Sequence, residues 1–281
     1  MVRIITDSGA DFEPHELKEK GIVYIPLFVY FGETEYQENI NLSKNQFYEL
    51  LEEGKHFPRT SLPSPHTIEC AFREAMEAGD EAVVVTLSSG LSGTCNSMMV
   101  VRDMLEYEDC YIVDSLTGTG GQRLLVEQAV KMRDEGKNDK EIVAELEAMR
   151  DNLVLYTCMD TLEYLMKGGR ISKSTYAVGT LANIKPIMHV DKEGKPEIPA
   201  KMIGMRRGMN YLRKKIAEET PNFAYPVYVM YTYNRANGEK LAALLREDGF
   251  DIPDERIIPV GAVIGTHIGP NACAIVYIGQ A

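Results

Sequence analysis

Short apolar runs and amphipathic segments alternate along the first half of the chain. The runs are rich in β-branched or aromatic residues, and we expect strands at Val2–Thr6, Ile22–Phe31, Ala82–Leu87 and Tyr111–Val113. Apolar residues at helical spacing predict helices that begin at Ser64-Pro65, near residue 122 and at Asn138. Strands that alternate with helices predict an α/β unit whose mostly parallel sheet is covered on both faces.

The pattern changes after about residue 155. Strand-like runs recur at 184–190, 227–233, 257–265 and 272–278, with helices near 210–219 and 239–247 and a polar turn at 191–199. These runs predict a second α/β unit, so we divide the chain into an N-terminal domain, 1–155, and a C-terminal domain, 156–281. A cleft is expected between the two domains.

Charge and cysteine content narrow the function classes. The 281 residues include 30 basic and 42 acidic ones, a net charge of −12, which disfavours binding to nucleic acid or resting on an anionic membrane. The five cysteines are scattered and odd in number, which argues against a disulfide framework or zinc ribbon. With neither a signal-peptide pattern nor a long apolar run, we expect a soluble cytoplasmic protein.

Three segments gather small hydroxyl residues close to the ends of expected strands: TSLPS at 60–64, SSGLSGT at 88–94 and DSLTG at 114–118. In open α/β sheets, ligands bind beyond the carboxyl ends of strands, where helix N-termini direct free N–H groups outward. Hydroxyls and glycine N–H groups that converge there form an anion site without a positive charge. Helix capping and turn formation are the alternative for any one segment.

Gly90 and Ser92 also resemble the start of a nucleophile elbow, which would make Ser92 the nucleophile of an esterase or thioesterase that uses His267. The elbow needs a glycine two residues beyond the serine, because the turn is too tight for a side chain there. This chain has Thr94 at that position. The sequence therefore favours a binding protein and keeps the hydrolase as the alternative.

His267 differs from the other four histidines because it lies in a glycine-rich segment, GAVIGTHIGP at 261–270. Glycine allows the backbone to approach a ligand closely. The other histidines are expected on the surface or, for His189, inside a strand. No second histidine stands at metal-ligating spacing, so we expect neither a metal site nor a cofactor.

Eight motifs, in order between residues 3 and 279, resemble those of the DegV family. They are TDSGAD at 6–11, IPL at 25–27, TSLPS at 60–64, SSGLSGT at 88–94, VDS at 113–115, LEYLMKGGRIS at 162–172, IKPIM at 184–188 and GAVIGTHIGP at 261–270. The resemblance implies the two-domain, EDD-type α/β fold of that family, with the ligand in the cleft between the domains. It also implies a bacterial FakB-like carrier of a long-chain fatty acid. Such a carrier presents the acyl carboxylate to a separate ATP-dependent fatty acid kinase, and the acyl phosphate feeds phospholipid synthesis.

The resemblance also assigns residues by position. It places the carboxylate site on Thr60 and Ser61, on Ser92 with Gly93 and Thr94, and on His267. It places partner-facing arginines at Arg170 and Arg207. It implies no catalytic residue in this chain, and it is compatible with transient contact with a membrane.

Overall fold

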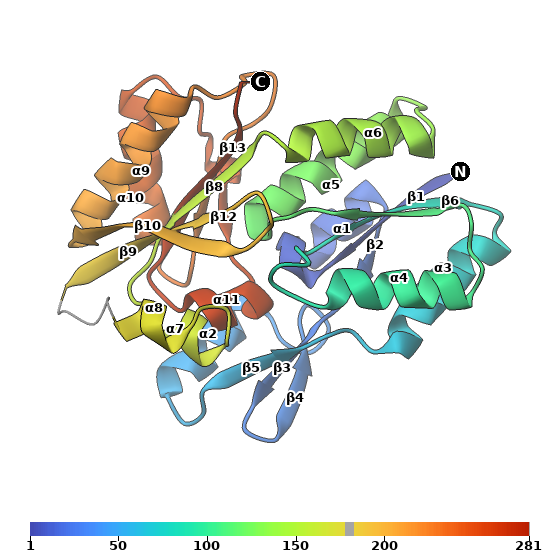
Figure 1. Cartoon of the computed structure of the whole chain (residues 1–281), viewed down its shortest axis with the longest axis horizontal. Helices are drawn as coiled ribbons and strands as arrows, with labels where there is room; N and C mark the ends of the chain where they lie inside the picture. The colour runs from blue at the N-terminus through green and yellow to red at the C-terminus, as the bar shows by residue number, and fades with distance from the viewer. Residues whose placement is uncertain (178–182, 281) are drawn as a thin grey trace.

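The first sheet is parallel, as expected. In the computed structural model, which describes residues 1–177 and 183–280, its strand order is β2-β1-β6-β7. These strands are Ile22–Ile25, Val2–Asp7, Glu81–Thr86 and Cys110–Asp114. Helices α3 (Pro65–Glu77) and α4 (Thr94–Met104) cover one face (Figure 1). Helices α5 (Thr119–Asp134), α6 (Asp139–Arg150) and the shorter α1 (Pro14–Lys20) cover the other.

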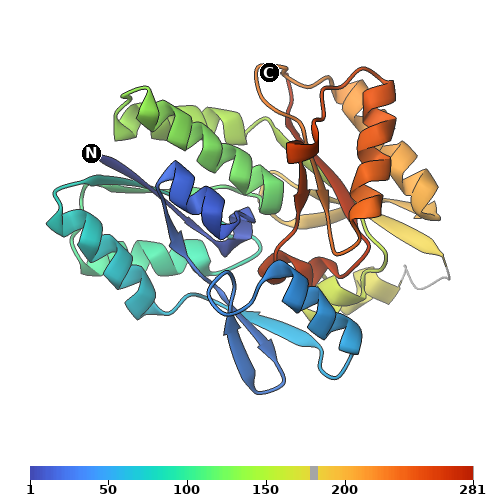
Figure 2. The same ribbon diagram turned by 180° about the vertical axis from the view of Figure 1, so that it is seen from behind.

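The second sheet has six strands in the order β10-β9-β8-β13-β11-β12. They are Pro196–Ile203, Ile184–Val190, Leu153–Cys158, Cys273–Ile278, Tyr228–Tyr231 and Ile257–Pro259. Neighbours are antiparallel except β11 and β12. Helices α9 (Met205–Glu219) and α10 (Arg235–Glu247) pack on the outer face of this sheet (Figure 2). The short 3-10 helix Asp254–Arg256 leads into β12.

One continuous hydrophobic core joins the two sheets. Helix α5 packs against β1 and β6 of the first sheet and against β8, β11 and β13 of the second. The same cluster of buried side chains therefore includes Ile4 and Val83 on one side and Met230 and Val276 on the other. No helix in residues 1–177 and 183–280 is long and apolar enough to cross a membrane.

A small antiparallel sheet, which the sequence did not predict, lies beside this core. Its order is β4-β3-β5, with β4 at Thr34–Gln37, β3 at Phe28–Phe31 and β5 at Pro58–Ser61. Helix α11 (Ala262–Ile268) packs against β3 and β5, and also against α2 (Lys44–Glu53) and α7 (Glu163–Lys167). A further short helix, α8 (Lys173–Ala177), follows α7.

Three sequence expectations need correction. The run 22–31 is two strands in different sheets, separated at Pro26-Leu27, where the Leu27 N–H donates to Ser8 Oγ. The run 257–265 is a strand only as far as Pro259 and then becomes helix α11. The polar turn expected over 191–199 ends early, because β10 begins at Pro196 and pairs with β9.

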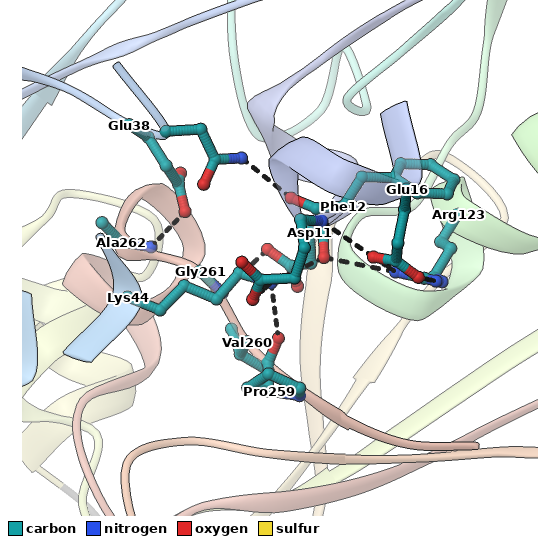
Figure 3. A network of polar contacts seen from close by, with 12 residues as sticks. Asp11, Phe12, Glu16, Glu38, Lys44, Arg123, Pro259, Val260, Gly261 and Ala262 are labelled. Carbon is teal, nitrogen blue, oxygen red and sulfur yellow. Dashed lines mark hydrogen bonds and ion pairs between the residues drawn. The ribbon is translucent and has the colours of Figure 1, made fainter. Parts of the chain in front are cut away.

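Helix α11 begins among buried acidic side chains (Figure 3). Asp11 Oδ1 accepts from the Gly261 N–H at 2.9 Å, and the two oxygens of Glu38 accept from the Ala262 and Val263 N–H groups at 2.6 and 3.1 Å. The ammonium of Lys44 donates to the carbonyl oxygens of Asp11 and Pro259. Buried carboxylates this close to one another are costly unless they are hydrogen-bonded and partly neutralised, and this network does both.

The acidic groups predict how stability depends on pH. Burial, and then the nearby Asp11 carboxylate, raise the pKa of Glu38 to about 8, and burial raises the pKa values of Asp7 and Asp11 to about 6. Between about pH 4 and pH 8 the folded protein therefore holds protons that the unfolded chain has lost. The stability that these buried, protonated carboxyl groups contribute is complete below about pH 4 and is lost as the pH rises through 8. Between pH 6.5 and 8, Glu38 alone lowers the free energy of unfolding by roughly 2 kcal/mol.

Denaturant unfolding measured between pH 6.5 and 8.5 checks this prediction. Wild-type stability should fall across the window, and Glu38→Gln should flatten the slope, because glutamine does not titrate. Glu33→Gln, an exposed change in the same segment, should keep the wild-type slope. Wild-type stability that stays level or rises over this range contradicts the prediction.

Candidate ligand-binding site

A narrow apolar cavity lies between the two large sheets, beyond the carboxyl ends of β6 and β7. It holds about 810 Å³ of atom-free space, counting its opening to solvent, and little of that space is wider than a water molecule. Most of the lining side chains are aliphatic or methionine: Leu27, Leu87, Leu91, Leu155, Leu165, Met188, Val190, Met230, Val260, Val263, Ile264 and Ile268. Such a space fits a slender apolar chain better than a broad or polar molecule.

Thr60 and His267 meet at this cavity. Thr60 lies in β5 and His267 in the last turn of α11, and Thr60 Oγ1 is 2.9 Å from His267 Nε2. The two residues are 207 positions apart, so the packing of α11 against the small sheet is what brings them together. The sequence predicted both as site residues, and the structure places both in the cavity lining.

The His267 imidazole is neutral at pH 7. Burial, and then the positive charge of Arg170, lower the pKa of this histidine to about 3. Its Nδ1 atom is buried without a hydrogen-bond partner among the residues that the structure describes. A Cβ atom added to Gly168 would lie 2.2 Å from that nitrogen, so the ring fits only because residue 168 has no side chain.

Ser92 also lines the cavity, but it does not contact the histidine. Its Oγ atom is 2.8 Å from Thr94 Oγ1 and accepts from the Thr94 N–H at 3.3 Å. The hydroxyl that reaches His267 Nε2 belongs to Thr60. A serine hydrolase needs the nucleophile bonded to the base, and this arrangement lacks that bond in the described residues.

Arg170 brings a positive charge to the cavity wall, where the hydroxyl-rich segments had suggested a site without one. Its guanidinium lines the cavity, donates to the carbonyl oxygens of Leu91 and Gly168 at 3.0 and 2.5 Å, and is half-buried. Removal from water lowers the pKa of Arg170, but an arginine remains charged at neutral pH. Thr60, Ser92, Arg170 and His267 thus form a polar region of the cavity wall, and Thr119, Thr157 and Thr232 are further polar residues of the lining.

The other predicted site residues lie outside the lining. Ser61 and Gly93 are exposed, and Thr94 is fully buried, where it holds the Ser92 hydroxyl. Arg207 is exposed in the first turn of α9 and is not among the cavity residues. The partner-facing roles given to Arg170 and Arg207 stay predictions.

Sequence reasoning missed the aliphatic residues of the cavity lining. It also missed Thr119, which connects the cavity to the buried acidic side chains at the start of α11. Thr119 lines the cavity, and its hydroxyl donates to Asp11 Oδ2. Its φ of 48° is rare for a β-branched residue. The aliphatic lining has no distinguishing sequence signal, because leucine and valine on a strand look the same whether they face a cavity or a filled core.

Comparison with known proteins agrees with this architecture. The DegV family model matches residues 1–280. DegV domain-containing proteins of Clostridium perfringens and Streptococcus pyogenes are 33% and 35% identical, over 99% of this chain and 97% and 98% of theirs.

Solved structures show the same fold. A DegV family protein from Thermus thermophilus, described as binding fatty acid, has a TM-score of 0.87 at 26% identity, over 99% of both chains. DegV of Bacillus subtilis, described as a fatty acid binding protein, has a TM-score of 0.84 at 25% identity over 99% of both chains. Both solved relatives are thus described as binding fatty acid. The family match over nearly the whole sequence shows that the chain belongs to the DegV family.

Proposed function

We propose that this chain binds one long-chain fatty acid, with the acyl chain in the narrow cavity and the carboxylate at the region formed by Thr60, Ser92, Arg170 and His267. The observation that carries the proposal is a mainly aliphatic cavity whose wall holds a guanidinium, an imidazole and the hydroxyls of Thr60 and Ser92. The fatty-acid-binding descriptions of the solved relatives support the same ligand class. Thr94 supports the carboxylate site indirectly, through its bond to Ser92, whereas Ser61 and Gly93 are exposed and their ligand contacts stay predictions.

The energetics suit this ligand. Burial of a methylene contributes about 0.8 kcal/mol, so an acyl chain of about 14 methylenes contributes roughly 11 kcal/mol before ordering costs are subtracted. The carboxylate loses water on entry and needs hydrogen bonds in return. Charge-assisted bonds from hydroxyl or guanidinium donors contribute about 1.5–3 kcal/mol each, which offsets that loss.

A neutral His267 directs the Thr60 hydroxyl. If the imidazole donates its proton from Nε2 to Thr60 Oγ1, the hydroxyl hydrogen of Thr60 is free to donate to a carboxylate. The opposite tautomer would leave a buried Nδ1–H without an acceptor in residues 1–177 and 183–280. We therefore assign the Nε2–H tautomer and treat Thr60 as the direct ligand donor.

We further propose that the bound fatty acid is presented to an ATP-dependent fatty acid kinase. A carboxylate oxygen would attack the γ-phosphorus of ATP, a new O–P bond would form, and ADP would leave. Arg207 supports a docking role, since it is exposed and has no ion-pair partner among the residues that the structure describes. Arg170 lies at the cavity, so it can serve the carboxylate, the partner or both.

The first experiment is native mass spectrometry of the purified protein, followed by extraction under denaturing conditions. We expect one long-chain fatty acid per chain. The proposal fails if the protein is empty, does not take up fatty acid, and instead hydrolyses acyl esters with activity that Ser92→Ala removes.

Removal of either hydroxyl should weaken binding. Thr60→Val and Ser92→Ala should each raise the palmitate dissociation constant roughly 10- to 100-fold, because each deletes a bond to a charged group. Fluorescence displacement or calorimetry measures the change. Thr34→Val and Ser89→Ala, at exposed positions outside the cavity lining, are the matched controls and should bind as wild type.

A methyl group at residue 168 should also weaken palmitate binding, because it displaces the His267 imidazole. Gly168→Ala places its Cβ against the imidazole, so the ring must move away from Thr60, and we expect at least a 10-fold loss of palmitate affinity. In the control Gly279→Ala, the new Cβ lies 3.5 Å from its nearest neighbour. Equal affinities of the two variants would show that the position of the imidazole does not matter.

Charge reversal separates docking from lipid binding. With its cognate kinase and ATP, Arg207→Glu should lose acyl phosphate formation while keeping wild-type fatty acid affinity. Lys240→Glu, an exposed reversal on α10, controls for the change in net charge. Arg170→Glu should lower both acyl phosphate formation and fatty acid affinity, because the Arg170 guanidinium borders the cavity. A fall in lipid affinity for Arg207→Glu would contradict the docking assignment.

A further inference from the structure

The N-terminal end of α11 is capped by residues from distant parts of the chain. Gly261, at the N-cap position, has no side chain to offer, and the next two N–H groups have no local capping partner. All three N–H groups are bound by Asp11 and Glu38, which are 224 to 250 positions away in sequence. An uncapped buried helix end would leave these donors unpaired, so the cap decides where the helix begins.

Glu38 approaches this end so closely that only glycine fits at position 261. A Cβ atom there would lie 1.9 Å from Glu38 Oε1 and 2.8 Å from Asp11 Oδ1. Glu38 is also buried, with 1% of its surface exposed, and both of its carboxylate oxygens are used by the helix. Its position therefore leaves the helix start little freedom to shift.

The other end of α11 carries His267, which contacts Thr60. With about 1.5 Å of rise per residue, Ala262 and His267 are about 7.5 Å apart along the axis, so a shift at one end moves the other. Glu38 directly follows β4 and Thr60 lies in β5, and both strands flank β3 in the small sheet. The small sheet thus holds α11 at both ends, through Glu38 at the start and Thr60 at the finish.

We propose that Glu38 is a positioning residue for ligand binding: by capping α11 from the small sheet, it sets where the His267 imidazole meets the Thr60 hydroxyl. This inference rests on the proposed fatty acid site. Glu38 does not line the cavity, so its effect on a ligand must pass through the helix. Asp11 shares the cap but also bonds Thr119 in the cavity wall, which makes Glu38 the cleaner residue to test.

The test compares Glu38→Gln with the exposed control Glu33→Gln. Glutamine has nearly the same shape, but its NH₂ group faces a backbone N–H and cannot accept from it. We expect a 5- to 20-fold higher palmitate dissociation constant for Glu38→Gln and a wild-type value for Glu33→Gln. In ¹⁵N spectra of the ligand-free protein, the His267 ring nitrogens should show one neutral tautomer in wild type and a mixture in Glu38→Gln.

A double-mutant cycle with Thr60→Val tests whether Glu38 acts through the contact between His267 and Thr60. If Glu38 acts through the His267–Thr60 contact, its substitution should change palmitate affinity less than 2-fold once Thr60 is valine. Should Glu38→Gln not fold, Glu38→Asp, which keeps the carboxyl group but shortens the reach, takes its place with the same two readouts. A folded variant with unchanged palmitate affinity and an unchanged His267 tautomer overturns the inference.

The same data keep this inference apart from the proposed function. If wild-type protein binds palmitate and Thr60→Val weakens it, the ligand site stands whatever Glu38→Gln does. If wild type does not bind palmitate, the proposed function fails, and the ¹⁵N signature of His267 still reports whether Glu38 positions the ring. A fully additive cycle would place the effect of Glu38 outside the His267–Thr60 contact and would also overturn the inference.

Discussion

The candidate binding site depends on how a seven-residue helix is held in place. Helix α11 is too short to be stable by its own hydrogen bonds and has no capping side chain of its own. Asp11 and Glu38 supply the cap, Thr60 contacts the histidine at the other end, and α2 and α7 pack on its sides. Because these partners come from both halves of the chain, the site can form only when the whole molecule has folded.

Charge is arranged around the cavity so that its interior stays apolar. The carboxylates of Asp11 and Glu38 are turned toward backbone N–H groups, and the Thr119 hydroxyl that borders the cavity is already committed to Asp11. The Arg170 guanidinium is held by two carbonyl oxygens at the polar region. An acyl chain would therefore meet mostly hydrocarbon in the cavity, and a charged donor only where Arg170 borders it.

The sequence predicted the parts of the fold that local pattern controls. The parallel strands, helix α3 with its Ser64 cap, and the Asn138–Glu141 capping box of α6 were all found. Helix α11 was predicted as a strand, because its cap comes from Glu38 and Asp11 and no local residue announces it. For the site, Thr60, Ser92 and His267 could be named from their segments, whereas the exposure of Ser61 and Gly93 could not, since neighbours along a strand or turn face different ways.

The electrostatics of His267 favour a carrier over a hydrolase. A catalytic histidine must take up a proton, and in serine hydrolases a buried carboxylate stabilises the imidazolium. Here burial and the Arg170 charge act in the opposite direction. A pKa near 3 means that protonation of this imidazole costs roughly 5 kcal/mol more than protonation of an unperturbed histidine. The ring also contacts Thr60 and not Ser92. A histidine that stays neutral can still hold a neighbouring hydroxyl by a hydrogen bond, as His267 holds that of Thr60.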